Sequence, residues 1–344
     1  MSRRTLTMLI ASVGTAAAIA VSVLIPVPYV ILGPGPTLNT LGKDSSGEQL
    51  ISIQGHQTFQ TSGHLNMVTV SYAGGPGSNI NIFSALAAWL NPDQAVVPEQ
   101  ELFPAGQTQQ QTQQQNTAEM ASSEQIATAA AFTQLGISYT TEVTVAQAEK
   151  GYPAYGVLKS GDIITAVDGA PVTSDATLTS LIRAHPVGAK LTLSVLRGGQ
   201  TQQVPVSTVP SGGHPIIGVE VGDQYKFPFS VKISIGDIGG PSAGMMFALG
   251  IIDKLTGDNL AGGKFIAGTG EITPNGQVQP IGGIQQKMIG ARNAGATVFL
   301  APASNCADTK GAVPAGLRVV KVGTLSQAVN DLEAIKAGKP VPSC

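Results

Sequence analysis

The stretch from Thr5 to Ile25, which reads TLTMLIASVGTAAAIAVSVLI, carries no charged side chain over 21 residues. At roughly 1.5 Å of rise per residue, a helix of this length can cross a hydrocarbon core roughly 30 Å thick. Arg3 and Arg4 precede it, and the positive-inside rule keeps such residues on the cytoplasmic side. The sequence therefore predicts that residues 1–32 form a cytoplasmic N-terminus and a single-pass anchor in the cell membrane, with the rest of the chain on the extracytoplasmic side.

A cleaved signal peptide is the alternative interpretation of this stretch, because small residues recur in GTAAAIA. The apolar run continues through VSVLIPVPYVIL, however, where a mature secreted protein would change to polar sequence. This continuation favours an uncleaved transmembrane anchor.

The chain has two cysteines, Cys306 and Cys344. Outside the cytoplasm a disulfide between them can persist, and it would attach the C-terminal tail to the preceding domain. Two unpaired thiols remain the alternative, since the sequence does not show whether the two Cα atoms come within about 7 Å. Neither cysteine belongs to a Cys/His cluster with zinc spacing, so no structural metal is predicted.

The charge balance excludes some classes of partner. The net charge of −2 leaves no basic stripe to neutralise phosphates, so nucleic acid is not an expected partner. The chain also lacks the pattern G-x-x-x-x-G-K-[ST], which cradles nucleotide phosphates. We therefore predict no ATPase module, no ATP dependence and no cofactor.

Residues 104–117, PAGQTQQQTQQQNT, are low in complexity and rich in glutamine and threonine. They offer few apolar side chains to offset the entropy of ordering, which is typical of a flexible loop. A small polar helix follows. We assign residues 106–140 to a Gln-rich loop and a connecting helix.

The segment VLKSGDIITAVDGAPV, followed by the helical pattern SDATLTSLIRAH, resembles a PDZ domain of the kind attached to bacterial envelope proteases. The resemblance implies that residues 141–210 form a mainly β domain. In such domains an extended peptide end adds as a strand to an exposed sheet edge. The loop that would bind the peptide carboxylate is not recognisable here. A small domain that acts only as a spacer or lid is the alternative.

Ser242 lies within GPSAG, which matches the G-x-S-x-G elbow of α/β-hydrolases. That fold needs a histidine base later in the chain, yet all four histidines precede the serine. A chymotrypsin-like order could formally use His56 or His64, so a His-based hydrolase remains an alternative. Neither histidine lies in a recognisable motif.

A serine without an adjacent base is a poor nucleophile, and a neutral lysine can supply the base. In IGGIQQKMIGARNAGA, Lys287 lies on the same helical face as Ile284, Met288 and Ala291. Desolvation on an apolar face disfavours the charged amine and lowers its pKa. The alternative is that Lys287 extends along the helix to water.

The segment from IGGPSAG to VFLAP resembles the proteolytic domain of Lon proteases over some 65 residues, through PSAG, TGEI, GQV, PIGG and the lysine helix. The resemblance implies a catalytic dyad of Ser242 and Lys287, with Thr269 orienting the lysine. Backbone amides at the start of the nucleophile helix suit an oxyanion hole, and those of Ser242 and of Gly240 or Ala243 are the candidates.

These assignments predict an α+β fold. Residues 33–105 and 211–344 form the N-terminal and catalytic parts of one Lon-like domain, with the PDZ domain inserted between them. The arrangement resembles bacterial membrane-anchored proteases with PDZ and Lon-like domains. It implies an ATP-independent serine endopeptidase that cleaves peptide bonds of extracytoplasmic proteins, with the PDZ domain selecting or gating substrate. Domains of the Lon type commonly form rings, so a homo-oligomer is also implied. The alternative function is an envelope protein that binds partners through the PDZ domain and whose Lon-like domain is not catalytic.

Overall fold

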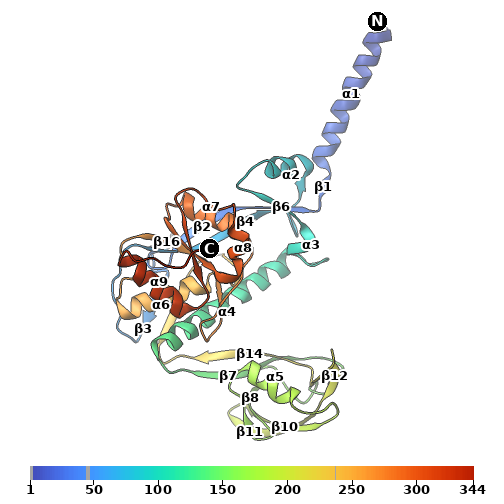
Figure 1. Cartoon of the computed structure of the whole chain (residues 1–344). Coiled ribbons are helices and arrows are strands. Elements are labelled where there is room, and N and C mark those ends of the chain that lie inside the picture. Colours follow the sequence, from blue (N-terminus) through green and yellow to red (C-terminus); the bar gives the residue numbers. More distant parts are fainter. Residues whose placement is uncertain (1–2, 44–46, 237) are drawn as a thin grey trace. The chain divides into compact units, whose positions relative to one another are not determined.

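The computed structural model describes residues 3–43, 47–236 and 238–344, without the side chains of residues 17–24. The chain folds into two compact units (Figure 1). The larger unit combines Met1–Ile137 with Phe229–Cys344, and the smaller unit is Ser138–Pro228. The larger unit is therefore discontinuous in sequence, and each unit is described below by itself.

The N-terminal apolar stretch forms helix α1 (Arg3–Leu24). Among the residues whose side chains are described, no helix is both long enough and apolar enough to cross a bilayer. The predicted anchor at residues 5–25 includes residues 17–24, whose side chains lie outside that part of the chain. The described residues thus do not support the transmembrane part of the predicted fold, and the anchor remains a prediction.

A six-stranded mixed sheet organises the larger unit. Its strand order is β20-β19-β16-β4-β2-β6, in which β20, β19, β16 and β4 run parallel, and β4, β2 and β6 pair antiparallel. The bounds of these strands are β2 Tyr29–Asn39, β4 His64–Ala73, β6 Ala95–Pro98, β16 Phe265–Gly268, β19 Val298–Pro302 and β20 Arg318–Val322.

Helices α6 (Gly244–Thr256) and α7 (Ile284–Asn293) contact side chains that point to opposite faces of this sheet. In β16, Ala267 belongs to a buried cluster with Met288 of α7. A Cβ added to the next residue, Gly268, would lie 2.7 Å from Met246 Sδ of α6. Because successive strand residues point to opposite faces, the two helices sandwich the sheet. The ends of both helices thereby meet beyond the carboxyl end of β16.

Shorter elements complete the larger unit. They are the pair β1 Pro26–Val27 and β5 Ile80–Asn81, the pair β3 Ile51–Gln54 and β15 Ser230–Ile233, the pair β17 Glu271–Ile272 and β18 Val278–Gln279, and the helices α2 Ile82–Trp89, α3 Glu99–Leu102, η1 Ala303–Asn305, α8 Cys306–Thr309 and α9 Leu325–Lys336.

The Gln-rich segment departs from its prediction. Helix α4 runs from Gln109 to Leu135, so most of the expected loop at 104–117 is helical. Glutamine and alanine are good helix formers, and a capping box between Thr108 and Gln111 fixes the N-terminus. The second half of α4 buries alanines and packs against α6. Tertiary burial therefore offsets the ordering entropy that composition alone leaves uncompensated.

The smaller unit is a five-stranded antiparallel path, β11-β10-β8-β7-β14, with a short strand β9 paired to β8 and one helix, α5. Its core is aliphatic and includes Val143, Leu178 and Leu193. The bounds are β7 Thr140–Ala148, β8 Ile163–Val167, β9 Ala170–Pro171, α5 Asp175–Arg183, β10 Lys190–Arg197, β11 Gln200–Ser207, β12 Val209–Ser211, β13 His214–Ile216 and β14 Val219–Lys226.

This unit extends beyond the expected boundary at residue 210. Strand β14 pairs with β7 from Val219 to Lys226, with one irregularity, so the chain as far as Pro228 packs with the smaller unit. Residues 211–228, expected in the catalytic part, therefore belong to the smaller unit. Their alternation of half-buried and exposed residues along β14 suits a strand with one buried face.

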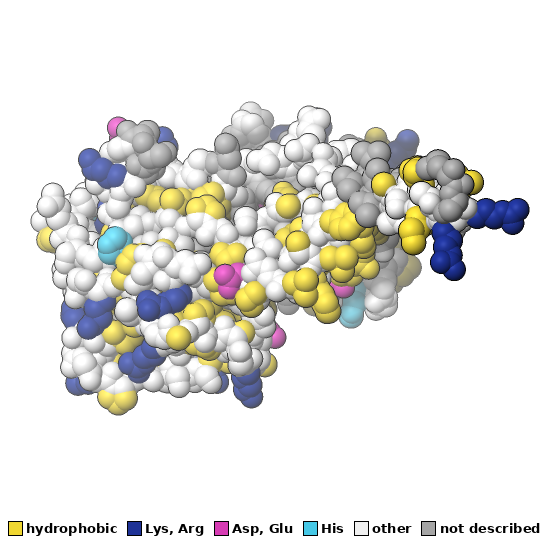
Figure 2. Space-filling view, turned by 90° about the horizontal axis from the view of Figure 1, so that it is seen from above, with side chains coloured by type: hydrophobic (Ala, Val, Ile, Leu, Met, Phe, Trp, Pro, Cys, Tyr) yellow, Lys and Arg dark blue, Asp and Glu magenta, His cyan; other side chains and the backbone are white. Residues whose placement is uncertain are grey.

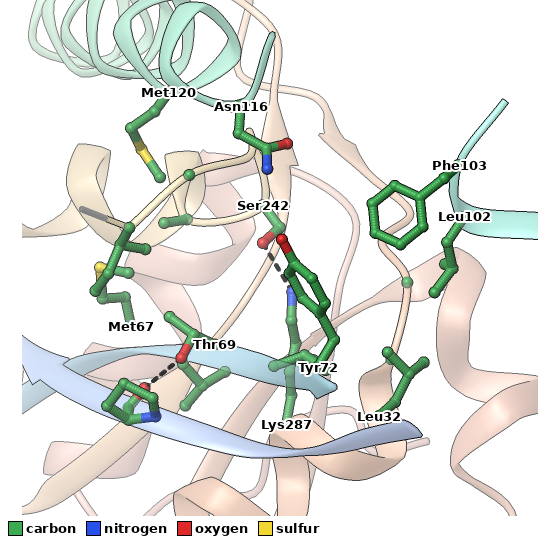
Figure 3. Close-up of a pocket in the computed structure, with 18 residues that line it drawn as sticks. Leu32, Met67, Thr69, Tyr72, Leu102, Phe103, Asn116, Met120, Ser242 and Lys287 are labelled. Atoms are coloured by element: carbon green, nitrogen blue, oxygen red, sulfur yellow. Dashed lines mark hydrogen bonds between the residues drawn. The ribbon is translucent and has the colours of Figure 1, made fainter. Parts of the chain in front are cut away.

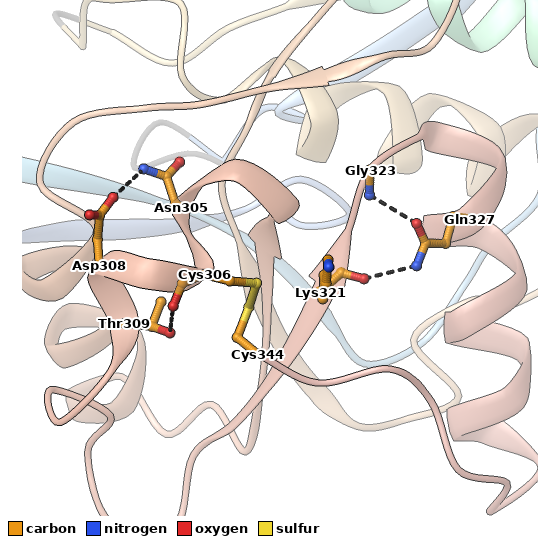
Figure 4. Close-up of a disulfide and its surroundings, with 8 residues drawn as sticks. All are labelled: Asn305, Cys306, Asp308, Thr309, Lys321, Gly323, Gln327 and Cys344. Carbon is orange, nitrogen blue, oxygen red and sulfur yellow. Dashed lines mark hydrogen bonds between the residues drawn. A yellow bond between two sulfur atoms is a disulfide. The ribbon is translucent and has the colours of Figure 1, made fainter.

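The two cysteines form a disulfide between Cys306 and Cys344, with the Cα atoms 5.0 Å apart (Figure 4). The bond joins the C-terminal residue to α8, and the Lys321 amide hydrogen of β20 is donated to the carbonyl of Pro342 in the same tail. The tail is thereby fixed along the edge of the central sheet.

Candidate active site

Ser242 lies in the turn that leads into α6. Gly240 has a φ of +89°, which L side chains rarely adopt, so glycine is required for the turn. Gly244 begins the helix, and a Cβ there would lie 2.9 Å from Ile272 Cγ2. These two glycines allow the half-buried Ser242 to stand at the N-terminus of a buried helix.

Lys287 reaches this serine from the first turns of α7. Its Nζ lies 2.7 Å from Ser242 Oγ (Figure 3). The same Nζ lies 3.1 Å from Thr269 Oγ1. The lysine side chain is only 4% exposed, and its helix contributes Ile284 and Met288 to the core. The structure thus brings together Ser242, Lys287 and Thr269, three residues that the sequence singled out.

Thr269 follows directly after β16 and is fully buried. Its hydroxyl donates to the Ser242 carbonyl at 3.0 Å, so its oxygen lone pairs face the lysine amine as acceptors. The Gly270 amide donates to the same Ser242 carbonyl at 2.8 Å. Thr269 therefore fixes both the backbone of Ser242 and the orientation of the Lys287 amine.

Burial lowers the pKa of Lys287 from 10.5 to about 8, because desolvation disfavours the charged amine. A buried cation ordinarily needs a partner, and this amine has two hydroxyl groups as its described neighbours. The arrangement favours the neutral amine, which can accept a proton.

The serine and lysine open into a cavity of about 470 Å³ within the larger unit. Figure 3 shows Met120 of α4, Tyr72 of β4 and the loop residue Phe103 around it. The lining is mainly apolar and comprises Leu32, Pro36, Met67, Val68, Thr69, Val70, Tyr72, Leu102, Phe103, Asn116, Met120, Ile238, Gly239, Ser242, Ala243, Gly282, Gly283 and Lys287.

Helix α4 supports the nucleophile turn, a role that sequence reasoning missed. The Asn116 carbonyl accepts from the Gly240 amide at 3.2 Å, and Ser123 Oγ donates to the Pro241 carbonyl at 3.0 Å. The signal that could have revealed this helix is the capping pattern Thr108-x-x-Gln111, which marks a helix start. The contacts themselves join segments more than a hundred residues apart.

The amides proposed for an oxyanion hole differ in their availability. The Gly240 amide donates to the Asn116 carbonyl and so is engaged in this structure, and its role as an oxyanion donor stays a prediction. The amides of Ser242 and Ala243 donate to no acceptor among the described residues. They stand at the N-terminus of α6, where the helix dipole favours negative charge.

The two histidines considered as bases do not line this cavity. The His56 ring lies 4.6 Å from that of Phe229 in a tilted arrangement, and its Nδ1 lies 2.9 Å from the Gln57 carbonyl. His64 stacks on Phe265, with ring centroids 4.4 Å apart. The structure gives Ser242 a lysine neighbour and no histidine neighbour among the residues that line the cavity.

The smaller unit has a groove of its own, about 190 Å³, between α5 and the strands β13 and β14. Strand β14 is an edge of the sheet path. Its apolar lining includes Leu178 and Ile182 of α5 and Val219 and Val221 of β14, and Arg183 is the basic residue of the lining. An exposed strand edge beside an apolar slot is the geometry that accepts an added peptide strand.

Comparisons with known proteins agree with this division. Residues 231–333 match the Lon protease (S16) C-terminal proteolytic domain, and residues 111–208 match the PDZ domain. The PDZ match begins within α4, which packs on the larger unit, and ends at residue 208, close to the expected boundary at 210, whereas the compact smaller unit runs from residue 138 to 228.

Individual relatives cover the proteolytic part. Lon protease 1 of Bacillus subtilis (strain 168) is 32% identical over 158 residues, covering 44% of this chain and 20% of the relative. Lon protease 1 of Sorangium cellulosum (strain So ce56) is 42% identical over 93 residues, which cover 26% of this chain and 11% of the relative. This chain thus spans about a fifth or less of these relatives.

Among solved structures, the PDZ domain of an SdrC-like protein from Listeria innocua is 26% identical, covers 23% of this chain and 92% of that chain, and has a TM-score of 0.22. The family matches give the domain content of the chain: it joins a PDZ domain to a Lon C-terminal proteolytic domain.

Proposed function

We propose that the protein is an ATP-independent serine endopeptidase in which Ser242 is the nucleophile and Lys287 the general base. The observation that carries the proposal is the 2.7 Å separation of Lys287 Nζ and Ser242 Oγ, made by a lysine whose pKa burial lowers to about 8. The match of residues 231–333 to a Lon proteolytic domain supports a serine peptidase.

In the proposed reaction, neutral Lys287 accepts the hydroxyl proton while Ser242 Oγ attacks the substrate carbonyl carbon. The resulting ammonium returns the proton to the leaving amine as the peptide C–N bond breaks, which leaves an acyl-enzyme. Lys287 then takes a proton from water as the water oxygen attacks the ester carbonyl, and it returns that proton to Ser242 Oγ as the ester C–O bond breaks. Thr269 acts as a positioning residue, since it accepts from the amine and donates to the Ser242 backbone.

The negative charge on the substrate oxygen needs donors in this mechanism. The amides of Ser242 and Ala243 suit this role because they are not engaged by other described residues and lie at the N-terminus of α6. The Gly240 amide would join them only if it left the Asn116 carbonyl.

The apolar cavity beside Ser242 indicates the substrate. Met67, Phe103 and Met120 line it, and its volume of about 470 Å³ fits a large apolar side chain. We infer that the enzyme cleaves extended or unfolded segments next to such residues. The groove between α5 and β14 would hold a peptide end and so select or gate the substrate.

For localisation, we propose that α1 anchors the protein in the cell membrane and that both units lie on the extracytoplasmic side. The uncharged run from Thr5 to Ile25 supports the anchor. The disulfide between Cys306 and Cys344 supports an oxidising compartment.

The test is degradation of a fluorogenic unfolded protein, without nucleotide, by the full chain in detergent micelles. We expect cleavage by the wild type, none by Ser242→Ala, and normal cleavage by Ser326→Ala, which alters an exposed serine on α9. Equal cleavage by wild type and Ser242→Ala would contradict the proposed function.

A further inference from the structure

Helix α2 (Ile82–Trp89) has its hydrophobic face on the outside. A surface helix of a water-soluble domain buries its large apolar residues and exposes polar ones. In α2 the buried residues are two alanines, Ala85 and Ala88. Besides Ser84 and Ala87, the exposed residues of α2 and its C-cap are large and apolar: Ile82 is 38% exposed, Phe83 45%, Leu86 50%, Trp89 72% and Leu90 75%.

The position of α2 is tied to the end of α1. Helix α1 ends at Leu24, and two residues later Pro26 pairs with Asn81 in the β1–β5 ladder. Asn81 is also the N-cap of α2, because its side chain accepts from the Ser84 amide at 2.9 Å. The start of α2 is therefore hydrogen-bonded to the chain that emerges from α1. In Figure 2, hydrophobic side chains gather on the part of the larger unit from which α1 extends.

The chain around α2 carries no charge to desolvate. From Leu65 to Pro92 the sequence has no Asp, Glu, Lys or Arg. Helical hydrogen bonding satisfies the backbone of α2, and the Asn81 cap satisfies one of its free amides. With 8 residues the helix is only about 12 Å long, too short to cross a bilayer, so it would lie in the plane of the interface.

We propose that α2 is a membrane-interface helix that inserts its outer face into the phospholipid bilayer beside α1, with Trp89 at the level of the headgroups. This inference rests on the proposed membrane anchoring by α1. Indole rings favour that level because they are apolar with one polar N–H. The insertion holds the catalytic unit against the membrane surface, so that its substrates are segments close to the bilayer.

Trp89 is the single tryptophan of the chain, so its fluorescence reports on α2 without a label. The full chain is reconstituted into phosphatidylcholine vesicles with or without brominated acyl chains, and flotation of protein with the vesicles is measured in the same samples. We expect co-flotation and a loss of about half or more of the Trp89 emission with brominated lipid, because an interfacial helix lies about 5–10 Å into the bilayer.

The matched control moves the tryptophan within the same unit. In Trp89→Phe combined with Phe59→Trp, α2 stays apolar and the new indole replaces a 42% exposed ring that contacts the C-cap of α6. In Figure 1, α6 and β3 lie at the other end of the larger unit from α2. We expect this variant to float with the vesicles and to lose little emission.

A second variant makes the outer face of α2 polar without changing a buried residue. Leu86→Gln with Leu90→Gln alters two exposed side chains, so the fold should persist. We expect flotation through α1 to remain while the quenching of Trp89 falls at least about two-fold and its emission shifts to the red.

Each other outcome overturns the inference. Flotation without quenching of Trp89 would leave the anchor in place and refute insertion of α2. Equal quenching in the Phe59→Trp control would make the quenching non-specific. An emission that follows protein concentration instead of bromination would assign the face to a second copy of the chain. Failure of the wild type to float would refute the anchor and the inference together.

Discussion

Two buried ionisable side chains, one in each unit, have opposite electrostatic surroundings: one has a charged partner and the other has none among its described contacts. In the smaller unit Asp162 is 2% exposed and accepts from Arg197 Nε at 2.7 Å and Nη2 at 2.6 Å. In the larger unit Lys287 is 4% exposed and contacts two neutral hydroxyl groups. The hydrogen bonds of Arg197 lower the pKa of Asp162, whereas burial lowers the pKa of Lys287 to about 8.

The difference separates a structural charge from a reactive one. A buried carboxylate with a bidentate partner stays ionised and holds β10 to the loop that precedes β8. A buried amine without a counter-ion is destabilised in its charged form and becomes a base near neutral pH. In the proposed mechanism, the stability cost of burying Lys287 is the physical source of its reactivity, and four predictions test this contrast.

The largest expected effect is on catalysis. Ser242→Ala and Lys287→Met should each lower the rate of peptide cleavage at least about 10⁴-fold, because the nucleophile and its base act as one unit. Single-turnover hydrolysis of an unstructured peptide measures the loss. Lys264→Ala, at an exposed lysine, serves as the control and should retain full activity.

The next effect is on the stability of the PDZ domain. Arg197→Met leaves the Asp162 carboxylate buried without its partner, which should cost about 3 kcal/mol in the opening free energy of that domain. Hydrogen exchange of β10 in the full chain measures it. The double variant with Asp162→Asn should recover part of the loss. An equally large loss in the double variant would deny that the uncompensated charge is the cause.

The opposite change in stability is expected on replacing Lys287. Lys287→Met should raise the free energy of unfolding of the larger unit by up to about 3 kcal/mol at pH 7, since no amine is left to desolvate. Because the folded-state pKa is about 8 and the ordinary value 10.5, the gain should shrink as pH rises between these values. Denaturant unfolding at a series of pH values measures this trend. A gain independent of pH would mean that burial of the amine is not the cause.

The smallest effect concerns Thr269. Thr269→Val keeps the shape but removes the acceptor for Lys287 and the donor to the Ser242 carbonyl. We expect kcat to fall about 10–100-fold with little change in KM, because the amine is less well oriented. Restoration by Thr269→Ser would assign the effect to the hydroxyl group, and a change confined to KM would contradict a positioning role.

The sequence singled out the residues that meet at the candidate site better than the segments that support them. Ser242 and Lys287 were singled out from a glycine-rich turn, from an apolar helical face and from the resemblance to the proteolytic domain of Lon proteases. Helix α4 was missed because composition cannot show that its alanines pack on α6 or that Asn116 meets Gly240. The partners of those contacts are distant in sequence, so no local pattern of residues indicates that they meet.

The full extent of the smaller unit, beyond the expected boundary at residue 210, was missed for a similar reason. Strand β14 completes the sheet only by pairing with β7, some eighty residues earlier in the chain. The sequence shows that α2 is rich in apolar residues, but which side of the helix is buried depends on the tertiary fold.

The most direct test of the account is the pH dependence of Ser242 acylation by a serine-reactive phosphonate. The second-order rate constant should rise about tenfold per pH unit below a midpoint near 8 and level off above it, as Lys287 loses its proton. It should be lost in Lys287→Met. A rate constant that does not change between about pH 6 and 10, or that survives in Lys287→Met, would contradict the account.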